Sequence, residues 1–430
     1  MPKVIIIGGG IIGLASSYYL RKKGFEVVVI DKEEPGMGCS SGNMGWIVPS
    51  LSDPVPAPGL FKTTFQWMMK SDSPLYIKPS ALPSLTRWIY HFRKYCNEAD
   101  FKKGYEAGLE ISRDTLSLFD ELEKDENIKF EVYKKGLLFV FLNEKYIEEK
   151  YNIYCHAEKI GLSAPVPMSK KELLKMEPAL SDNVAGGLYL PDERHTRPES
   201  LTKAIKDWLV KNGAEVKSHS EVKDFVIKED EIVGVKTLDE TIEGDYFLIT
   251  TGVLAADMLN KIGVSFPMTA GKGYSITITS PSLQLQQPLY LGDSRVTLSP
   301  FSDSLRVGGT MELSGINTNL DQRRIKSLLV TLQDYLKTPL SGENQKNWVG
   351  MRPMTPDGLP VLGEVPELKN TYVATGHAMS GISMSLSTGK IMSDLIVNGN
   401  SDVNISPFAP DRFKRRFSQI DKDNKEPMNI

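Results

Sequence analysis

The chain has 430 residues, of which 40% are hydrophobic and 24% charged, and these values exclude a disordered, collagen-like or disulfide-scaffold chain. The length allows about two to four domains. The 51 basic and 54 acidic side chains give a formal net charge of -3, so no overall basic field favours nucleic acid as a partner.

The cysteines and histidines predict neither a disulfide framework nor a metal site. Cys39, Cys96 and Cys155 are far apart and none belongs to a C-x-x-C motif. The five histidines show no spacing typical of a zinc site. No apolar run reaches the roughly 18 residues that a membrane-spanning helix needs. We therefore expect no metal, a reducing compartment and a cytoplasmic location.

The N-terminal residues predict a strand, a glycine turn, a helix and a second strand. Residues 4–7 are a continuous apolar run suited to a buried strand, and residues 11–23 fit a helix that Gly24 ends. Residues 25–30 form a second apolar run, and Asp31 follows it. Three consecutive glycines inside the apolar stretch argue against a secretory signal, because glycine is costly within an apolar helix.

Gly8, Gly10 and Gly13 have the G-x-G-x-x-G spacing of a dinucleotide site, where phosphates meet the free N–H groups of a helix N-terminus. Asp31 follows Gly13 by roughly twenty residues, the place where an acid binds a ribose. An acid here argues against a 2′-phosphate. The ligand is therefore FAD or NAD.

The next segments favour a flavin. Residues 38–46 are small, polar and glycine-spaced, and the alternation of strands and helices that continues an NAD domain stops there. A helix is predicted over residues 199–213, with Thr196 as its N-cap. Short strand-like runs follow over residues 215–226, 232–237, 241–243 and 246–251, the last ending in Thr250-Thr251-Gly252. This order resembles FAD-binding folds of the glutathione-reductase type.

The resemblance becomes specific near the C-terminus. Residues 348–363, WVGMRPMTPDGLPVLG, are similar to the W-x-G-L-R-P-x-T-P-D-G-x-P-x-x-G signature of the D-amino-acid oxidase superfamily. Residues 376–383, GHAMSGIS, resemble the family's final flavin loop. Matching pieces follow in the same order along nearly the whole chain, and they are most similar to D-amino-acid dehydrogenases, including D-hydroxyproline dehydrogenase-like members.

The resemblance implies an α/β fold with two interleaved domains. Residues 1–50, 190–265 and 345–400 are expected to form a discontinuous Rossmann domain of the glutathione-reductase type that binds FAD. Residues 51–189 and 266–344 are expected to form a substrate domain with an antiparallel sheet. Residues 401–430 are left as a C-terminal tail.

The resemblance also assigns roles to individual residues. Arg352 matches the arginine that binds the substrate carboxylate in the family, and a planar guanidinium suits a carboxylate. Lys272, Tyr274 and His377 are further candidates for the catalytic site. For each of these three, an ordinary packed or solvated side chain is the alternative interpretation.

The expected cofactor is non-covalent FAD, since no cysteine follows Cys155. The N–H groups of Gly381, Ile382 and Ser383 are expected at the start of the final helix, next to the flavin ring, with Ser380 as the alternative cap. The residues expected to hold FAD are Gly8, Gly10, Ile11, Ile12, Gly13, Asp31, Lys32, Cys39, Ser40, Ser41, Asn43, Met44, Gly45, Val222, Thr251, Gly252, Arg352, Gly376, Gly381, Ile382 and Ser383.

Two departures from the family pattern limit the substrate assignment. Glycine oxidases can carry a second arginine where this chain has Met379, and a pocket tyrosine where it has Val296, which speaks against glycine as substrate. Arg197 stands where relatives often carry an acid.

The resemblance implies dehydrogenation of a D-amino acid or a cyclic D-imino acid, such as D-proline or D-hydroxyproline, by hydride transfer to flavin N5. A quinone or another electron-transfer acceptor is expected to take the electrons. Three alternatives stay open: an oxygen-using oxidase of the glycine or sarcosine type, a flavin subunit of a hetero-oligomeric dehydrogenase, and a nicotinamide dehydrogenase.

Peripheral membrane contact and oligomeric state also stay open. Aromatic and basic residues gather in three segments, 61–69, 85–96 and 412–417, and could mark a surface on the inner face of the cytoplasmic membrane. The alternative interpretation is that these aromatic faces pack inside the protein.

Overall fold

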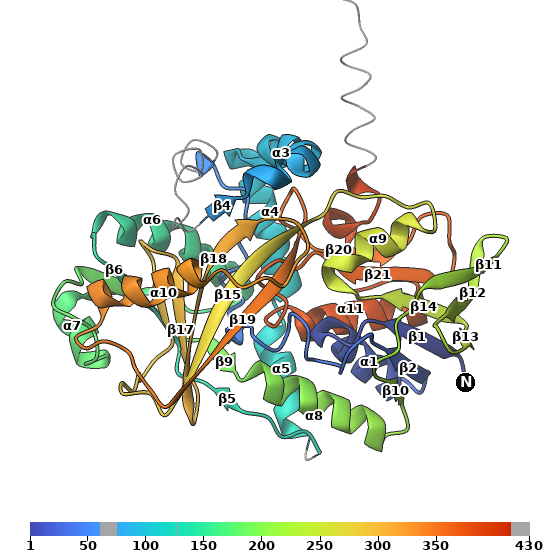
Figure 1. Cartoon of the computed structure of the whole chain (residues 1–430), viewed down its shortest axis with the longest axis horizontal. Helices are drawn as coiled ribbons and strands as arrows, with labels where there is room; N and C mark the ends of the chain where they lie inside the picture. The colour runs from blue at the N-terminus through green and yellow to red at the C-terminus, as the bar shows by residue number, and fades with distance from the viewer. Residues whose placement is uncertain (61–74, 126, 414–430) are drawn as a thin grey trace, which may run out of the picture.

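The computed structural model describes residues 1–60, 75–125 and 127–413 (Figure 1). A six-stranded sheet is its first layer. Five strands are parallel and β20 at one edge is antiparallel to its neighbour. The strand order is β10 (Glu215–Lys217), β2 (Glu26–Ile30), β1 (Lys3–Ile7), β14 (Tyr246–Ile249), β21 (Thr371–Thr375) and β20 (Val361–Glu364). The apolar run of β1 is buried on both faces, as predicted.

Helices cover one face of this sheet. α1 and α11 approach closely, because Gly389 has no side chain and a Cβ there would lie 2.6 Å from the Ala15 carbonyl carbon. The Tyr18 and Trp208 rings meet edge to face between α1 and α8, with centroids 4.7 Å apart. The helices are α1 (Ile11–Lys22), α5 (Thr115–Lys124), α8 (Pro198–Lys211) and α11 (Ser385–Asn398).

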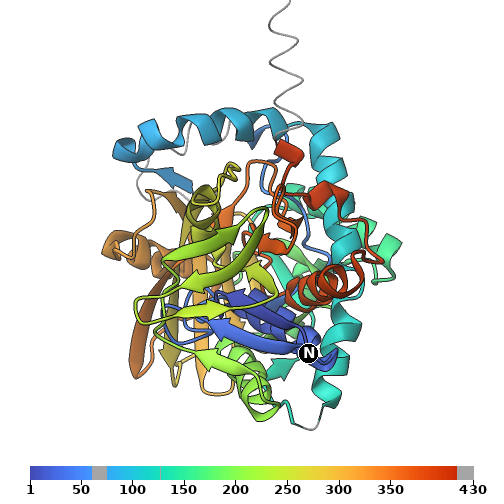
Figure 2. The same ribbon diagram turned by 90° about the vertical axis from the view of Figure 1, so that its right-hand side faces the viewer.

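A β-meander and a short helix cover the other face. They are β11 (Asp224–Lys228), β12 (Glu231–Lys236), β13 (Thr241–Glu243), η3 (Gly252–Leu254) and α9 (Ala255–Asn260). Figure 2 views this region with the green meander strands and the red α11 on opposite sides of the blue N-terminal strands. The run predicted over residues 215–226 divides into β10, which joins the parallel sheet, and β11, which starts the meander.

A second, nine-stranded sheet fills the other half of the molecule (Figure 1). Its order is β19 (Asn344–Met354), β15 (Thr269–Thr279), β18 (Ser304–Leu313), β17 (Val296–Pro300), β16 (Leu289–Leu291), β6 (Leu137–Phe141), β8 (Gly186–Leu190) and β7 (Val166–Ser169), with β4 (Leu75–Ile77) beside β18. α10 (Gln322–Tyr335) packs its apolar side chains on one face of this sheet.

The remaining elements surround these two sheets. A small sheet of β3 (Trp46–Ile47), β9 (Arg194–Thr196) and β5 (Val132–Tyr133) joins the two halves. The others are η1 (Pro79–Ala81), α3 (Leu82–Tyr95), α4 (Glu98–Ser112), α6 (Lys145–Tyr154), η2 (Cys155–Ile160), α7 (Lys170–Met176) and η4 (Ser406–Phe408).

The predicted α/β fold is confirmed, but the second sheet is mixed rather than wholly antiparallel, because β6 is parallel to β16 and β4 is parallel to β18. The six-stranded sheet takes its strands from three separated stretches of the chain, and all of them lie inside the segments expected to bind FAD. The domain boundaries stay a prediction, and β19 crosses the one placed at residue 345, because it pairs along its whole length with β15 of the nine-stranded sheet.

One expected detail of the α8 region is different in the structure. The N-cap of α8 is Arg197 rather than Thr196, whose hydroxyl instead donates to the Glu131 carbonyl oxygen. Arg197 forms ion pairs with Glu131, at 2.6 Å, and with Asp303. Arg197, at the position where relatives often carry an acid, therefore connects the start of α8 to the loops that contain Glu131 and Asp303.

Two of the aromatic and basic segments are at least partly described. In α3, Leu85, Trp88 and Tyr95 are buried, and Trp88 Nε1 donates to the Met354 carbonyl oxygen at 3.0 Å. Arg412 binds Asp357, and Phe413 is buried. Residues 61–69 lie outside the described part of the chain, as do residues 414–417.

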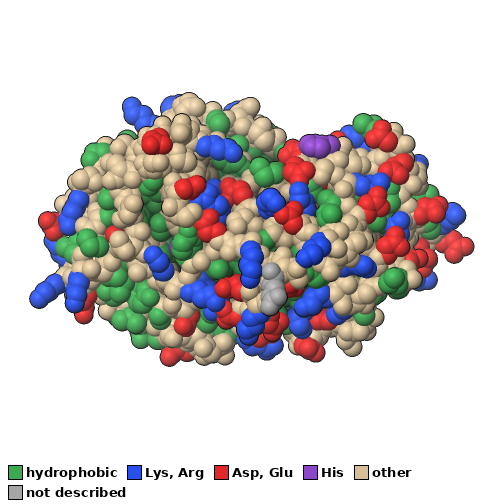
Figure 3. All heavy atoms as spheres, turned by 90° about the horizontal axis from the view of Figure 1, so that it is seen from below, with side chains coloured by type: hydrophobic (Ala, Val, Ile, Leu, Met, Phe, Trp, Pro, Cys, Tyr) green, Lys and Arg blue, Asp and Glu red, His purple; other side chains and the backbone are tan. Residues whose placement is uncertain are grey.

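The surface shown in Figure 3 carries interspersed acidic and basic side chains. Within residues 1–60, 75–125 and 127–413, no helix is both long and apolar enough to cross a bilayer. In the same ranges no three His, Cys, Asp or Glu side chains gather as metal ligands would.

Candidate active site

The glycine turn between β1 and α1 is built for close backbone contacts. Gly8 has φ +106°, and a Cβ there would lie 2.8 Å from the carbonyl carbon of Thr250. A Cβ on Gly13 would lie 2.0 Å from Gly8 O, so only glycine lets α1 start this near to β1. By contrast, the nearest atom to a Cβ on Gly10 would be Ser40 Oγ, at 3.6 Å. The open side of the turn is therefore at Gly10, where a phosphate would approach.

Asp31 lies beside this turn at the end of β2. Its carboxylate accepts from Gly9 N at 2.7 Å and from Glu33 N at 2.8 Å. Burial raises the pKa of Asp31. The backbone segment that leads to Val222 runs alongside, since Ser220 N donates to Asp31 O at 2.7 Å. The glycine turn, Asp31 and the segment that leads to Val222 thus lie together at the carboxyl ends of β1 and β2. Lys32, which follows Asp31, is exposed.

The loop over residues 38–45 contacts both the start of α1 and the strand β19. Ser40 Oγ accepts from Ile11 N at 3.0 Å, which satisfies one of the unpaired N–H groups of the helix N-terminus. Cys39 Sγ donates to Met351 O at 3.1 Å and accepts from Met351 N at 3.2 Å. Burial raises the pKa of the Cys39 thiol. Ile12 is partly buried on the same turn of α1.

Arg306 fixes the second half of this loop. Its Nη1 donates to Ser41 O at 3.0 Å and to Asn43 O at 2.7 Å, and its Nη2 pairs with Glu199 at 2.6 Å. From the sequence alone, Arg306 is assigned no role. The signal that could have suggested one is an arginine between two apolar residues of a strand-like run, Leu305-Arg306-Val307.

Further contacts place the loop on one face of the nine-stranded sheet. Ser275 Oγ of β15 donates to Gly42 O at 2.9 Å, and a Cβ on Gly308 of β18 would lie 2.4 Å from Met44 Sδ. Asn43 Oδ1 accepts from Gly45 N at 2.7 Å. The segment expected to run along the flavin therefore rests on the face of β15 and β18 to which Ser275 points.

Arg352 of β19 lies on that same face. β15 and β19 pair with Gly271 opposite Arg352, and a Cβ on Gly273 would lie 2.4 Å from the Arg352 Cζ. Arg352 Nη1 donates to Thr310 O at 2.8 Å. Burial lowers the pKa of Arg352 to about 10, so the guanidinium is charged at neutral pH. Among the described residues, no carboxylate forms an ion pair with Arg352.

Lys272 and Tyr274 lie on the other face of β15, because neighbouring residues of a strand point to opposite sides. Lys272 is 2% exposed and pairs with Glu312, at 3.5 Å, and Tyr274 OH donates to Glu312 at 2.7 Å. Tyr274 packs with the apolar residues of α10. Neither side chain therefore shares a face with Arg352, and this register favours the packed interpretation; a catalytic role of Lys272 or Tyr274 stays a prediction.

His377 is buried just after β21, and its Nε2 lies 2.9 Å from Thr388 Oγ1. Burial lowers the pKa of His377 to about 3, so the ring is neutral at physiological pH. Gly376 before it has φ +80°. At the end of β14, Gly252 has φ +56°, and its carbonyl accepts from Thr375 Oγ1 at 2.8 Å, so the Thr251-Gly252 and Gly376 turns lie together.

The turn over residues 380–384 precedes the final helix rather than opening it. α11 begins at Ser385, its N-cap is Met384, and neither Ser380 nor any other side chain caps it. Met384 N donates to Ser380 O, and Ser385 N to Ile382 O. Within the described residues, the N–H groups of Gly381, Ile382 and Ser383 donate to no protein acceptor, which leaves three donors for a ligand.

A small, partly open cavity of about 20 Å³ lies beside these groups. Its lining comes from three loops: Ser52, Asp53, Val55, Gly358, Leu359, Pro360, His377, Ala378, Met379, Ser380 and Met384. Burial raises the pKa of Asp53.

The loop that contains Ser50 leads into this cavity and is held by Glu193, whose carboxyl accepts from Ser50 N and Ser50 Oγ. Neither Asp53 nor Glu193 was singled out from the sequence, because both acquire their surroundings only through the fold.

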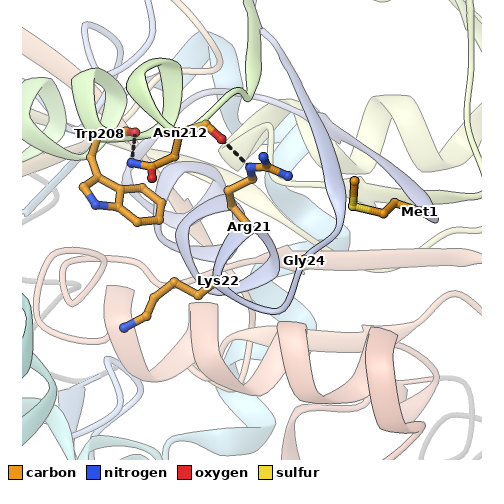
Figure 4. Close-up of a pocket in the computed structure, with 6 residues that line it drawn as sticks. All are labelled: Met1, Arg21, Lys22, Gly24, Trp208 and Asn212. Carbon is orange, nitrogen blue, oxygen red and sulfur yellow. Dashed lines mark hydrogen bonds between the residues drawn. The ribbon is translucent and has the colours of Figure 1, made fainter.

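A larger surface pocket of about 310 Å³ lies elsewhere, near the C-terminal ends of α1 and α8 (Figure 4). Arg21 lies at its edge and donates to the Asn212 carbonyl oxygen at 2.6 Å. The pocket shares no lining residue with the glycine turn, the Arg352 face or the small cavity.

The comparisons with known proteins agree with this geometry. The family model for FAD dependent oxidoreductases matches residues 3–395. The chain belongs to this family. The site fits FAD, because the open glycine turn, Asp31 and the three unpaired N–H groups provide donors and an acceptor along an extended ligand, and FAD is the cofactor of this oxidoreductase.

Relatives cover nearly the whole chain. The oxidoreductase is 30% identical over 420 residues to a D-amino acid dehydrogenase of Vibrio vulnificus, with 96% of this chain and 99% of the relative covered. The fold is similar to that of a glycine oxidase from Geobacillus kaustophilus, with a TM-score of 0.75, 24% identity and 96% and 99% of the two chains covered. An L-proline dehydrogenase from P. horikoshii gives a TM-score of 0.76 at 19% identity, with 96% and 98% covered.

Proposed function

We propose that this oxidoreductase dehydrogenates a D-amino acid or a cyclic D-imino acid, such as D-proline or D-hydroxyproline. Two similar proteins of Vibrio vulnificus, 30% and 29% identical, are named D-amino acid dehydrogenase. The observation that carries the proposal is Arg352, a charged guanidinium on the face that holds the expected flavin loop, with no carboxylate partner among the described residues.

Arg352 is suited to hold the substrate carboxylate. Its Nη1 is oriented by Thr310 O, and a guanidinium can still offer a carboxylate two parallel N–H donors. Gly273 leaves room directly beside the guanidinium. Because a carboxylate bound in this way fixes the position of the neighbouring α-carbon, Arg352 would set the distance and direction for the reaction.

FAD supplies the two-electron acceptor for the hydrogen that leaves the α-carbon. The N–H groups of Gly381, Ile382 and Ser383 add a positive electrostatic potential at one side of the site. His377 is neutral and pairs with Thr388, and so it orders the loop rather than carrying charge.

Anaerobic flavin reduction tests the substrate class. We expect D-proline, cis-4-hydroxy-D-proline or another member of a D-amino acid panel to bleach the visible flavin band of the purified protein. The matched L-enantiomers, glycine and sarcosine serve as controls. If sarcosine, glycine or an L-amino acid bleaches the flavin and no D-amino acid does, the proposed stereochemistry is wrong.

Replacing Arg352 tests the role of the guanidinium. We expect Arg352→Ala to lower kcat/KM by about 100-fold or more, because a charged hydrogen-bonded pair with the substrate is lost, while FAD stays bound. Arg352→Lys keeps the charge without the planar fork and should recover part of this loss. An unchanged kcat/KM in Arg352→Ala would contradict the assigned role.

We further propose that a quinone or an electron-transfer protein, rather than oxygen, reoxidises the enzyme. Parallel assays of hydrogen peroxide formation and of quinone reduction with the same substrate separate this from an oxidase of the glycine type. Activity of the purified chain with an artificial acceptor separates an enzyme that works alone from a subunit that needs a partner.

A peripheral contact with the inner face of the cytoplasmic membrane is part of the same hypothesis. Co-sedimentation of the whole chain with vesicles of acidic lipid, compared with vesicles of neutral lipid, measures it. Binding to neither kind of vesicle would remove this part of the proposal.

A further inference from the structure

A buried group of charged side chains lies behind Arg352, on the opposite face of β15 and β18. Glu312 is its centre: Tyr274 OH donates to it at 2.7 Å, Lys272 Nζ lies 3.5 Å away and Arg324 Nε lies 3.7 Å away. Lys272 also donates to Asn317 Oδ1 at 2.8 Å. Lys272 is 2% and Arg324 1% exposed. We call these five residues the Glu312 cluster.

The cluster meets the Arg352 side of the sheet at a β-bulge. β18 pairs with β15 at Lys272–Glu312 and at Tyr274–Gly309, so Thr310 and Met311 both stand opposite Gly273. Thr310 has φ +58°, a strained backbone for a β-branched residue.

Two arginines bind consecutive carbonyls of this bulge from opposite faces. Arg352 Nη1 donates to Thr310 O at 2.8 Å, and Arg324 Nη2 donates to Met311 O at 3.4 Å. Arg324 comes from the first turn of α10, and Arg352 from β19. Arg352, which lies at the candidate site, and Arg324, which lies on the opposite face of the sheet, therefore both bind this bulge.

The composition of the cluster is costly for packing alone. It places two cations and one carboxylate among apolar side chains, and an ion pair removed from water is often no more stabilising than apolar residues of the same size. The strained φ of Thr310 adds a further cost that the surrounding contacts must offset. Both costs are explained if the arrangement serves the position of Arg352.

We propose that Arg324, held by Glu312, is a positioning residue for Arg352. From the α10 side it fixes the Thr310–Met311 bulge, and the Thr310 carbonyl then holds the Arg352 guanidinium where it receives the substrate carboxylate. The inference rests on the proposed function, because it gives Arg352 that role. Arg324 and Glu312 touch neither substrate nor FAD in this arrangement.

The test compares Arg324→Met with Arg324→Lys in the FAD-loaded full-length enzyme. Benzoate is the probe for an unreactive carboxylate, and its binding is measured from the change in the visible flavin spectrum. We expect Arg324→Met to raise the Kd for benzoate and the KM for a reducing D-amino acid about tenfold, with kcat within about twofold. Arg324→Lys can still reach Glu312 and should recover most of the loss.

Tyr335→Phe is the matched control on the same helix. Tyr335 is the last residue of α10, and its hydroxyl lies 3.4 Å from Asp293. Removing this hydroxyl changes a buried polar contact at the end of the helix that is far from the bulge. We expect Tyr335→Phe to lower Tm without changing the Kd for benzoate. A Kd that rises as much in Tyr335→Phe as in Arg324→Met would overturn the inference, because any damage to α10 would then suffice.

Further outcomes separate the inference from the proposed function. If Arg352→Ala loses benzoate binding and Arg324→Met binds it normally, the function stands and the inference fails. If Arg352→Ala binds benzoate normally, the role of Arg352 fails first. Should Arg324→Met not fold, Tyr274→Phe removes one hydrogen bond to Glu312 and should raise the Kd for benzoate about threefold. An unchanged Kd in that variant overturns the inference.

Discussion

Gly273 lies directly beside the guanidinium of Arg352, so that a Cβ on Gly273 would come within 2.4 Å of the Arg352 Cζ. The atom in conflict is the far end of a flexible side chain rather than backbone. A methyl group at residue 273 would therefore displace the guanidinium and leave the strand pairing of β15 with β19 intact.

We expect Gly273→Ala to raise KM for the substrate about tenfold or more, because a displaced guanidinium loses a charged hydrogen bond, with a small change in Tm. Steady-state kinetics and thermal unfolding measure the two effects. Gly234→Ala in β12 is the matched control: it also adds a methyl group to a strand glycine, far from the site, with a nearest contact of 3.2 Å. An unchanged KM in Gly273→Ala would mean that the Arg352 guanidinium does not bind the substrate carboxylate from its position in this structure.

Asp31 provides a second prediction, on cofactor binding. Its carboxylate orients the N–H groups of Gly9 and Glu33 and lies where an acid binds a ribose. We expect Asp31→Ala to weaken FAD binding about 10- to 100-fold, as the loss of hydrogen bonds to a charged group predicts. Titration of the apoprotein with FAD measures the Kd, and Glu26→Gln, at the exposed start of the same strand, is the control. Equal affinities of both variants would argue against a ribose contact.

Glu193 predicts a pH-dependent stability. Burial raises the pKa of Glu193 to about 8. The folded protein therefore favours the protonated carboxyl, and the stability contributed by Glu193 is lost as the pH rises from the ordinary glutamate range through about 8. We expect Glu193→Gln to remove this dependence and to be more stable than the parent protein above pH 8, by up to a few kcal/mol.

Urea unfolding at pH 5 and at pH 9 measures this difference. The exposed Glu243→Gln is the control and should keep the pH dependence of the parent protein. If Glu193→Gln loses as much stability between the two pH values as the parent does, Glu193 does not cause the change.

The nucleotide half of the candidate site can be read from the sequence more directly than the substrate half. The glycine turn and Asp31 depend on local geometry and on a spacing within one βαβ unit, and both are read directly along the chain. The place of Lys272 and Tyr274 depends on strand register. In Gly271-Lys272-Gly273-Tyr274 the glycines alternate with the long side chains, and this alternation was the signal that the two pairs face opposite sides.

Other parts of the site had no signal in the sequence. Whether Glu193 or Arg324 is buried, and which group it meets, depends on contacts between residues far apart in the chain. The start of α11 was placed too early because the turn over residues 380–384 has helix-like hydrogen bonds to Ser380 and Ile382 before the helix itself begins. Helix ends of this kind differ by a few residues from a pattern-based prediction.

The last prediction concerns the C-terminal segment. Arg412 binds Asp357 through two hydrogen bonds, Nε to Oδ2 at 2.8 Å and Nη2 to Oδ1 at 3.0 Å, and donates from Nη2 to Leu359 O at 2.9 Å. The Arg412 and Asp357 side chains are 12% and 9% exposed. Breaking such a pair by removing one partner leaves a charge without compensation. We therefore expect Arg412→Ala to lower the free energy of unfolding by about 2–4 kcal/mol.

A double-mutant cycle with Asp357→Ala isolates the pair. Because both single variants lose the same interaction, the double variant should be clearly less destabilised than the sum of the two, with a coupling energy of about 1–3 kcal/mol. Arg113→Ala breaks an exposed pair with Glu110 on α4 and should cost no more than about 0.5 kcal/mol. Additive losses at Arg412 and Asp357 would show that the two residues stabilise the fold independently, and that the C-terminal segment is held by the burial of Phe413 instead.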